Sequence, residues 1–260
     1  METFQLAGSA PAAYERHLVP RLFEPLAARL LELAPPAGRV LDVACGTGVV
    51  ARQAAPLADA VTGIDINAGM IELARHSSPA IEWRVGDAEA LEYPASSADV
   101  VYCQQGLQFM ADPAAALRSM AAVLRPGGRV ALALWRPLEQ SPGFLALVQA
   151  LDHHAGTAAG DVLRGPFRLG DHAEVVAQLR MAGFADIRVY NHCHAVQFGS
   201  VAHLVEAEID ATPLAQQAAG WAPGVREAVT ATAEDALRSY TADDGLLFPM
   251  GAYVTTATKS

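Results

Sequence analysis

The stretch that decides the fold is Val40-Leu41-Asp42-Val43-Ala44-Cys45-Gly46-Thr47-Gly48. An apolar run carries one acidic residue near its end, passes through two glycines and enters a helical pattern. A helix N-terminus that follows the carboxyl end of a strand creates a crevice where nucleotide-like cofactors bind. The stretch therefore predicts a strand, a tight turn and a helix beside a ligand site.

Strand-like and helix-like segments alternate on both sides of this turn. We expect strands over 40–44, 61–65, 81–85, 99–103, 129–135, 186–193 and 253–257. Strands that alternate with helices at this spacing indicate a doubly wound sheet with right-handed crossovers. The predicted fold class is thus α/β, Rossmann-like, with a seven-stranded, mostly parallel sheet and helical cap insertions.

Helix signals mark several boundaries. Asn67, Asp112 and Asp171 stand where N-caps are expected. Before the first strand, leucines recur every four residues from Leu18 to Leu30, which is the spacing of one helix face. Pro20 and Pro25 interrupt that segment, because proline lacks an N–H group, so we expect a first helix around Tyr14 and a second from about Pro20, with a kink left open.

Three segments lack the alternating pattern, and we expect them to fold over the sheet as a cap. They are 1–34, 138–170 and 196–246. The core is expected at about 35–136, 171–195 and 250–258. The whole chain, 1–260, is predicted to be a single domain, and a homodimer is left open.

The bulk composition excludes several classes of protein. A net charge of −10 argues against a nucleic-acid partner, which needs clustered Lys and Arg. No apolar run reaches the ~18 residues of a membrane span, and the N-terminus has no signal-peptide pattern. Three scattered cysteines form neither a disulfide framework nor a zinc spacing, which favours a cytoplasmic protein.

Polar residues close the first three strands. Asp42 can accept hydrogen bonds from an ammonium group or from the loop amides. Asp65 follows Gly46 by 19 residues and can accept both hydroxyls of a ribose. Charge-assisted hydrogen bonds of this kind contribute about 1.5–3 kcal/mol each. Asp87, after Gly86, can meet the amino group of a base.

Together these residues resemble the class I S-adenosylmethionine (SAM) methyltransferases, in the small-molecule branch that includes the ubiquinone/menaquinone C-methyltransferases. The resemblance covers about residues 10–193. It implies that SAM is the cofactor and that the loop carries its methionine part. The loop residues so implied are Asp42, Ala44, Cys45, Gly46, Thr47 and Gly48.

The resemblance also assigns the rest of the cofactor. It implies that Asp65 binds the ribose and that Gln104 lies near the sulfonium. The residues expected around adenine are Ile66, Met70, Gly86, Asp87 and Ala88. Tyr14 either contacts the SAM carboxylate or is a packing aromatic.

Two positions depart from the family pattern. Ala44 replaces the first glycine of the loop, a change that the small-molecule branch tolerates. The fourth strand ends in Gln104-Gln105-Gly106, not in the Asn/Asp-Pro-Pro-aromatic signature of enzymes that methylate base or glutamine amino groups. This again favours a small-molecule acceptor.

The predicted reaction is methyl transfer from SAM to an O, N or C atom of a small molecule, such as a secondary metabolite or a quinone-like compound. One alternative is a SAM-binding protein of this fold without methyl transfer, either regulatory or catalysing a reaction such as cyclisation. An NAD(P)-dependent oxidoreductase is disfavoured, because no Tyr-x-x-x-Lys pair exists and Lys259 is the single lysine.

Catalytic side chains are harder to predict. His153 and His154 lie in the expected cap, where a general base for a hydroxyl acceptor would be placed. Gln105 is a further weak candidate. His192 and His194 share a strand face, but the sequence offers no third ligand, so no metal site is predicted.

Overall fold

A computed structural model describes residue 6 and residues 8–260. One mixed sheet runs through it, with strand order β3-β2-β1-β4-β5-β8-β6, and β7 pairs with β8 off this path. The strands are β1 (Arg39–Val43), β2 (Ala60–Asp65), β3 (Glu82–Val85), β4 (Ala98–Gln104), β5 (Leu124–Trp135), β6 (Phe184–Phe198), β7 (Thr241–Ala242) and β8 (Gly245–Lys259). The first five pair in parallel, and β8 is antiparallel to its neighbours.

Helices connect and cover these strands. The α-helices are α1 (Ala10–Ala13), α2 (Glu24–Leu33), α3 (Val49–Ala54), α4 (Ala68–Ser77), α5 (Pro113–Val123), α6 (Pro142–His154), α7 (Thr157–Arg164), α8 (His172–Met181), α9 (Val201–Ala211), α10 (Leu214–Ala218) and α11 (Val225–Ala236). A π-helix, η1 (Tyr14–Phe23), joins α1 to α2. Short 3₁₀ turns are η2 (Ala55–Leu57), η3 (Ala88–Ala90), η4 (Leu107–Phe109), η5 (Leu138–Gln140), η6 (Gly165–Phe167) and η7 (Arg238–Tyr240).

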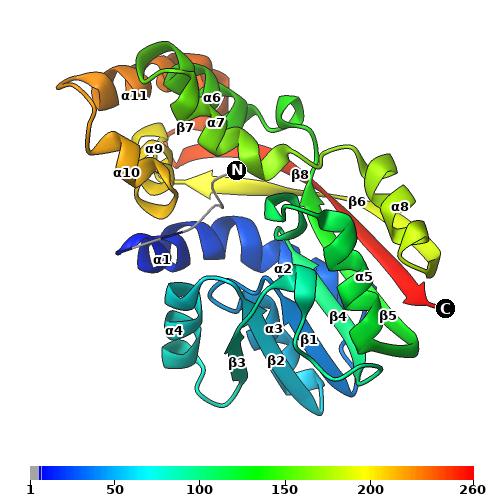
Figure 1. The fold of residues 1–260 in the computed structure, drawn as a ribbon. Coiled ribbons are helices and arrows are strands. Elements are labelled where there is room, and N and C mark those ends of the chain that lie inside the picture. Colours follow the sequence, from blue (N-terminus) through cyan, green and yellow to red (C-terminus); the bar gives the residue numbers. More distant parts are fainter. Residues whose placement is uncertain (1–5, 7) are drawn as a thin grey trace.

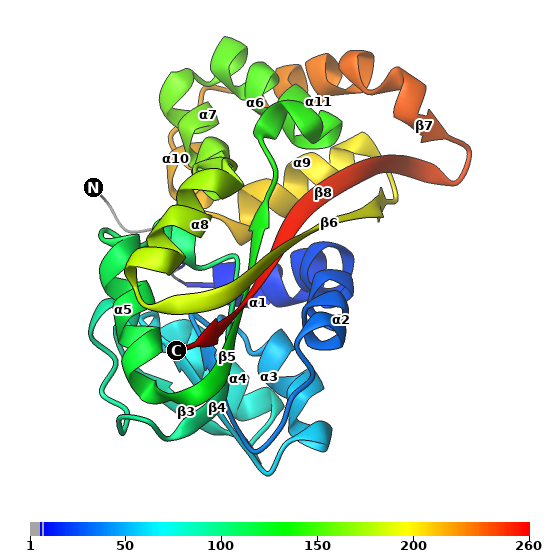
Figure 2. The same cartoon turned by 90° about the vertical axis from the view of Figure 1, so that its right-hand side faces the viewer.

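The α/β class and the mostly parallel sheet are confirmed. Buried apolar residues form one cluster on each face of the sheet. Val40 and Val100 belong to the cluster that includes α2 and α3, whereas Leu41 and Val101 belong to the cluster that includes α5 and α8. Figure 2 shows α5 and α8 on one side of the sheet and α2 on the other. Burial on both faces explains why these strands read as continuous apolar runs.

The strand count corrects the prediction, because the sheet has eight strands rather than seven. The additional strand, β7, pairs with the start of β8 through Thr241 and Leu246. The two last long strands also extend well beyond the predicted 186–193 and 253–257. They pair from Phe184 opposite Lys259 to Phe198 opposite Leu246. The Pro249 and Gly251 positions in β8 hide this length from pattern reading, because both residues disfavour strands.

The predicted start of a second helix at about Pro20 is also wrong, since α2 begins at Glu24 with Pro25 in its first turn. Helical structure continues from Ala10 to Leu33, and Pro20 lies inside η1. Proline has no N–H to donate in any helix, and here the helix continues past Pro20 in the π form. The three predicted N-caps are confirmed: Asn67, Asp112 and Asp171 each accept a backbone N–H bond.

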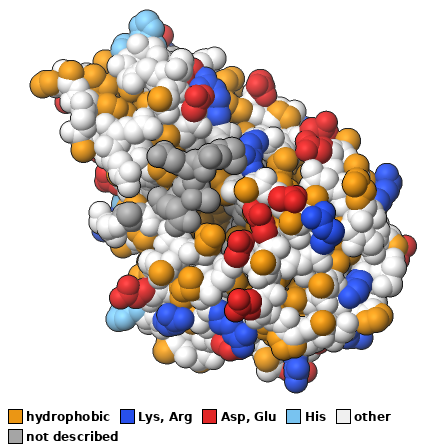
Figure 3. All heavy atoms as spheres, in the orientation of Figure 1, with side chains coloured by type: hydrophobic (Ala, Val, Ile, Leu, Met, Phe, Trp, Pro, Cys, Tyr) orange, Lys and Arg blue, Asp and Glu red, His pale blue; other side chains and the backbone are white. Residues whose placement is uncertain are grey.

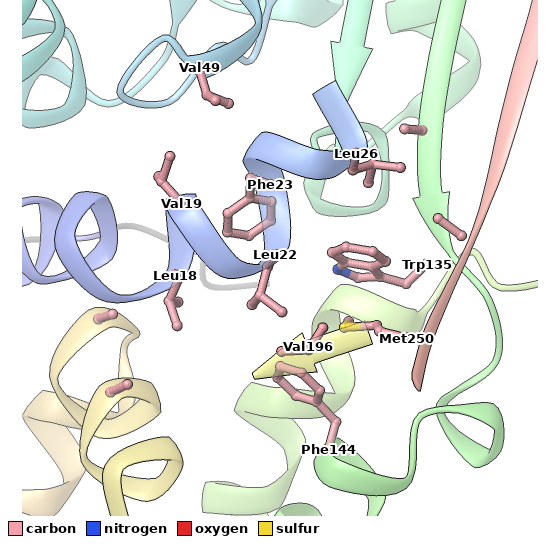
Figure 4. Packing of buried hydrophobic residues seen from close by; sticks show 14 of the residues in the cluster. Leu18, Val19, Leu22, Phe23, Leu26, Val49, Trp135, Phe144, Val196 and Met250 are labelled. Carbon is pink, nitrogen blue, oxygen red and sulfur yellow. The ribbon is translucent and has the colours of Figure 1, made fainter. Parts of the chain in front are cut away.

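Above the parallel strands, α6, α7, α9, α10 and α11 gather around the far ends of β6 and β8 (Figure 1). The helix η1 lies between this group and the sheet. Figure 4 shows Leu22 and Phe23 of η1 on the side of Trp135, with Phe144 and Val196 beyond. The rings of Phe23 and Trp135 lie 6.1 Å apart.

The surface in Figure 3 carries Lys and Arg side chains scattered among acidic ones. Of the described helices, none combines the length and the apolar character needed to cross a membrane.

Candidate functional site

A cavity of about 380 Å³ lies at the carboxyl ends of β1 to β4. Its volume falls in the ~300–1,000 Å³ range of small-molecule sites. The strand-end wall of this cavity contains nearly all the residues predicted to hold a cofactor. They are Tyr14, Asp42, Ala44, Cys45, Gly46, Asp65, Ile66, Met70, Gly86, Asp87, Ala88 and Gln104.

Four of the predicted residues lie elsewhere. Thr47 and Gly48 belong to the loop but do not line the cavity. His153 is exposed at the end of α6, and His154 Nε2 lies 2.7 Å from Thr232 Oγ1 on α11. The structure therefore separates both histidines from the cavity, whereas Gln105 does line it.

The Asp65 carboxylate links the end of β2 to the loop that follows β1. Its Oδ2 accepts a bond from the Gly46 N–H at 2.8 Å, and its Oδ1 accepts one from the Asn67 N–H at 2.8 Å. Burial raises the pKa of Asp65, and these two N–H donors oppose that rise. Each oxygen retains a lone pair, so the carboxylate can still accept bonds from a diol.

Asp42 is almost fully buried beneath the glycine loop. Its Oδ2 accepts a bond from the Ala51 N–H at 2.9 Å, in the first turn of α3. Burial, with a smaller contribution from the Asp65 charge, raises the pKa of Asp42 to about 7. Burial and the charges of Asp65, Glu15 and Asp42 likewise raise the pKa of the Tyr14 hydroxyl. The strand-end wall is therefore acidic, and a bound cation would relieve this repulsion.

The shape of the loop depends on glycine at two points. Gly48 has φ +91°, and a Cβ there would come within 2.2 Å of the Trp83 ring. A Cβ on Gly63 of β2 would come within 2.3 Å of the same ring. The Trp83 ring thus packs against the loop and restricts its shape. Its indole Nε1 donates to the Ser78 carbonyl at 2.9 Å.

Three glutamines at and just after the end of β4 present partly unsatisfied amides to the cavity. Gln104 Nε2 donates to the Phe23 carbonyl at 3.1 Å, and its Oε1 has no partner. Gln108 Nε2 donates to Gln105 Oε1 at 2.9 Å, which leaves Gln105 Nε2 and Gln108 Oε1 without partners. Gln105 also has φ +54°, a left-handed backbone that is uncommon outside glycine. Such strain and such unpaired groups are characteristic of binding sites.

The opposite wall of the cavity, here called the cap wall, is mainly apolar. It consists of Leu18, Leu22 and Phe23 from η1, Trp135, Phe144, Leu163, Pro166, Phe167, Glu208, Ala211 and Thr212. The Phe144 and Phe167 rings lie 5.6 Å apart. This wall supplies the apolar surface that a small organic ligand needs.

Glu208 of α9 is the functional candidate that sequence reasoning missed. It is 2% exposed, and burial raises its pKa to about 8. A signal was present, since Glu208 continues the helical spacing of the buried residues Leu204 and Val205. An acid on the apolar face of a helix is unusual enough to mark a position for attention.

No group of three or more His, Cys, Asp or Glu side chains suited to a metal occurs in the part of the chain that the structure describes. The His192 and His194 rings stack at 5.4 Å on β6, as their alternation predicts.

Residues 41–132 match a protein-family model described as a methyltransferase domain. The chain is 36% identical over 120 residues to a ubiquinone biosynthesis O-methyltransferase of Xanthomonas axonopodis pv. citri. That match covers 44% of this chain and 49% of the relative. The chain thus spans about half the length of the curated relatives it matches.

Solved structures share the fold over most of the chain. A phosphoethanolamine N-methyltransferase 2 of Haemonchus contortus, in complex with phosphomonomethylethanolamine and S-adenosylhomocysteine, superposes with a TM-score of 0.60 at 20% identity. It covers 96% of this chain and 56% of that one. The [4+2]-cyclase SpnF superposes with a TM-score of 0.54 at 22% identity and covers 91% and 81%.

The family model covers the segment that contains the glycine loop, Asp65, Asp87 and Gln104. The structural likenesses establish the fold around it. Residues 41–132 therefore resemble the methyltransferase-domain family, and the chain shares the fold of solved methyltransferase structures.

Proposed function

We propose that this protein transfers the methyl group of SAM to an uncharged small molecule. The observation that carries the proposal is the division of one cavity into two unlike walls. The strand-end wall combines the loop of a methyltransferase domain with acidic strand ends, and the cap wall is apolar.

The strand-end wall suits SAM chemically. SAM carries an ammonium group and a sulfonium, and the buried carboxyls of Asp42 and Asp65 have no cationic side chain beside them in the cavity lining. Asp65 retains acceptor capacity for the ribose hydroxyls, and Gln104 Oε1 is an unpaired acceptor. When bound, SAM supplies an activated methyl group that a nucleophile displaces without further cofactor chemistry.

The protein's own contribution is to orient the reactants and exclude water. Apolar side chains of η1 and of the cap wall surround the space next to Gln104 and Gln105. Orientation of two reactants in such an enclosed site can supply about 7–11 kcal/mol of barrier reduction.

The acceptor is inferred to be neutral and largely apolar. No Lys, Arg or His lines the cavity among the residues that the structure describes. A phosphate or carboxylate group would be held there without a cationic partner, at a large desolvation cost. The O-methyltransferase named above supports a hydroxyl-bearing acceptor, although only about half of that relative is matched.

The test is direct. The purified protein is incubated with methyl-labelled SAM and a panel of phenols, hydroquinones, amines and carboxylic acids, and calorimetry measures S-adenosylhomocysteine (SAH) and NAD binding in parallel. We expect micromolar SAH binding, no NAD binding and transfer to neutral aromatic acceptors. NAD binding without SAH binding would refute the proposal.

A SAM-binding protein without methyl transfer is the second candidate. The likeness to a cyclase shows that this fold also occurs in an enzyme named for another reaction. Tight SAH binding with no labelled product from any acceptor in the panel would favour this reading.

We also propose that the protein acts in the cytoplasm, since its cysteines are free and two of them, Cys45 and Cys103, are buried. A homodimer stays a prediction. The strand β6 ends the sheet and offers an edge at which a second copy can pair. Light scattering measures the mass in solution.

A further inference from the structure

Glu208 is a carboxyl group that the fold does not use. It lies near the end of α9 and lines the cap wall together with Ala211 and Thr212. Its Oε1 is buried without a hydrogen-bond partner, and the side chain is 2% exposed. The neighbouring hydroxyl does not satisfy it, because Thr212 Oγ1 donates to the Glu208 main-chain carbonyl at 2.6 Å.

Other shielded carboxyls in this protein have clear structural partners. Asp42 caps the first turn of α3 through the Ala51 N–H. Asp99 accepts the Arg39 N–H at 2.7 Å and pairs with Arg125. A buried carboxyl without such partners costs stability, because it loses its hydration and gains little in return. Packing alone therefore gives no reason for an acid at position 208, whereas a ligand in the cavity does.

The cavity restricts what that ligand can be. Glu208 shares the cavity with Gln104 and Gln105 of the strand-end side, so it faces the space between the cofactor wall and the cap wall. Its surroundings are aromatic and aliphatic, as with Phe144 and Phe167. A neutral hydroxyl fits there, since it can both donate to and accept from a carboxyl without bringing a second charge into an apolar site.

We propose that Glu208 is the general base of the reaction and that the acceptor is an apolar molecule carrying a hydroxyl group. This rests on the proposed function. The acceptor O–H bond breaks and its proton passes to the Glu208 carboxylate. The oxygen electron pair forms the new O–CH₃ bond, the C–S bond breaks, and sulfur keeps that electron pair. Charge balances, because the sulfonium becomes a neutral thioether while the carboxylate becomes a neutral acid.

The proton affinity of Glu208 suits this role. Burial raises its pKa to about 8, and a general base works best when its pKa lies near the working pH. A cation bound in the same cavity favours the ionised carboxyl. The base form is therefore most available when the methyl donor is present.

Charged side chains also occur on α9 and on the elements packed against it. On α9 itself they are His203, Glu206 and Asp210; on η1, Glu15, Arg16, His17 and Arg21; on α11, Arg226, Glu227, Glu234 and Asp235; and on β6, Asp186, Arg188, His192 and His194. Helices α1 and α10 carry none. Several are paired elsewhere, such as Glu206 with Arg226 at 2.9 Å and His203 with His17 at 3.4 Å. Burial is the cause of the raised pKa of Glu208.

The first test measures binding and needs no turnover. Calorimetry titrates 2-naphthol and its ether 2-methoxynaphthalene into the SAH complexes of wild type, Glu208→Gln and Glu208→Leu. We expect wild type to bind the naphthol at least tenfold tighter than the ether, and the leucine variant to lose that preference. SAH affinity should stay within twofold throughout. Equal binding of naphthol and ether, or no naphthol binding, by wild type would overturn the proposal, as would the same preference in the leucine variant.

The second test measures turnover of 2-naphthol with SAM. Wild-type kcat should rise with pH up to about 8, because the carboxylate form is the base. Glu208→Gln should lower kcat at least 100-fold and abolish this rise. Glu206→Gln, on the same helix but outside the cavity, is the matched control and should behave as wild type. A glutamine variant with wild-type kcat and pH profile would overturn the proposal.

The two tests separate this inference from the proposed function. Absence of methyl transfer to every acceptor by wild type refutes the function. The preference for naphthol over its ether then still decides whether Glu208 recognises a hydroxyl.

Discussion

The acidic side chains on the two walls of the cavity differ in their hydrogen-bond partners. On the strand-end wall, each of Asp42, Asp65 and Asp87 accepts a backbone N–H bond from a nearby loop or helix turn. On the cap wall, Glu208 Oε1 has no partner. The first arrangement holds a loop in shape before any ligand arrives, and the second leaves a polar atom for the ligand to satisfy. Preorganisation and recognition are thus divided between the walls.

The largest effect should come from the residue that serves both the loop and the cofactor. Asp65→Ala removes two acceptor oxygens, and charge-assisted bonds contribute about 1.5–3 kcal/mol each. We expect SAH affinity to fall by about 100-fold, measured by calorimetry. Asp59→Ala, at an exposed position just before the same strand, is the matched control. An unchanged SAH dissociation constant for the Asp65 variant would refute the proposed contact between Asp65 and the ribose.

The rigidity of the strand-end wall can be broken at its turn. Gly48→Ala introduces a Cβ at φ +91° against the Trp83 ring, and strain and overpacking should together cost about 2–4 kcal/mol of unfolding free energy. Gly183→Ala has a similar φ of +87° but open space around the Cβ, and should cost only about 1 kcal/mol. Urea denaturation measures both. Equal losses would mean that contact with Trp83 does not matter.

The acidity of the strand-end wall predicts a pH dependence of cofactor binding. Burial raises the pKa of Asp42 to about 7, so the carboxyl becomes protonated as the pH falls through 7. The ammonium group of SAH is a cation that would favour the ionised form of Asp42, hence SAH affinity should fall by about tenfold between pH 7.5 and pH 6. Asp42→Asn should bind more weakly and without this slope. A slope that persists in the variant would assign the titration to another group.

A change on the cap wall should weaken acceptor binding and leave cofactor binding unchanged. Phe167→Leu trims an apolar side chain that packs against Phe144. We expect 2-naphthol to bind the SAH complex about fivefold more weakly, with SAH affinity within twofold of wild type, since the change touches one wall only. Parallel losses for both ligands would show that the walls are not independent.

The smallest effect is expected from the histidines at the end of α6. His153→Ala and His154→Ala should leave kcat and KM within twofold of wild type, because neither side chain lines the cavity. Steady-state kinetics on the acceptor found in the panel checks this. A loss above tenfold in either variant would restore a histidine as the base and weaken the case for Glu208.

The sequence was sufficient for the strand-end wall because its signals are local. Gly46 and Gly48 mark the turn, Asp65 is the last residue of one strand, and Asp87 follows the next strand by two residues. Parallel strands bring such positions to one edge without further information. The methyltransferase-domain match covers this same region.

The cap wall could not be predicted in the same way. Glu208 faces the cavity because α9 packs on η1, almost 200 residues earlier in the chain. The length of β6 and β8 comes from their mutual pairing, which overrides Pro249 and Gly251. The continuity of η1 through Pro20 comes from its π-helical bonding. The first two outcomes depend on contacts that are distant in sequence, which no local pattern contains.

The helix η1 touches both walls, since Tyr14 lies with the strand ends and Leu22 and Phe23 lie with the cap. An element that borders two ligands is a route by which their affinities can be linked, even where a change on one wall leaves the other wall intact. By thermodynamic reciprocity, the factor by which the bound donor changes acceptor affinity equals the factor by which the bound acceptor changes donor affinity. The resting protein is therefore a poor reporter of acceptor preference, and the donor-loaded state is the one that selects.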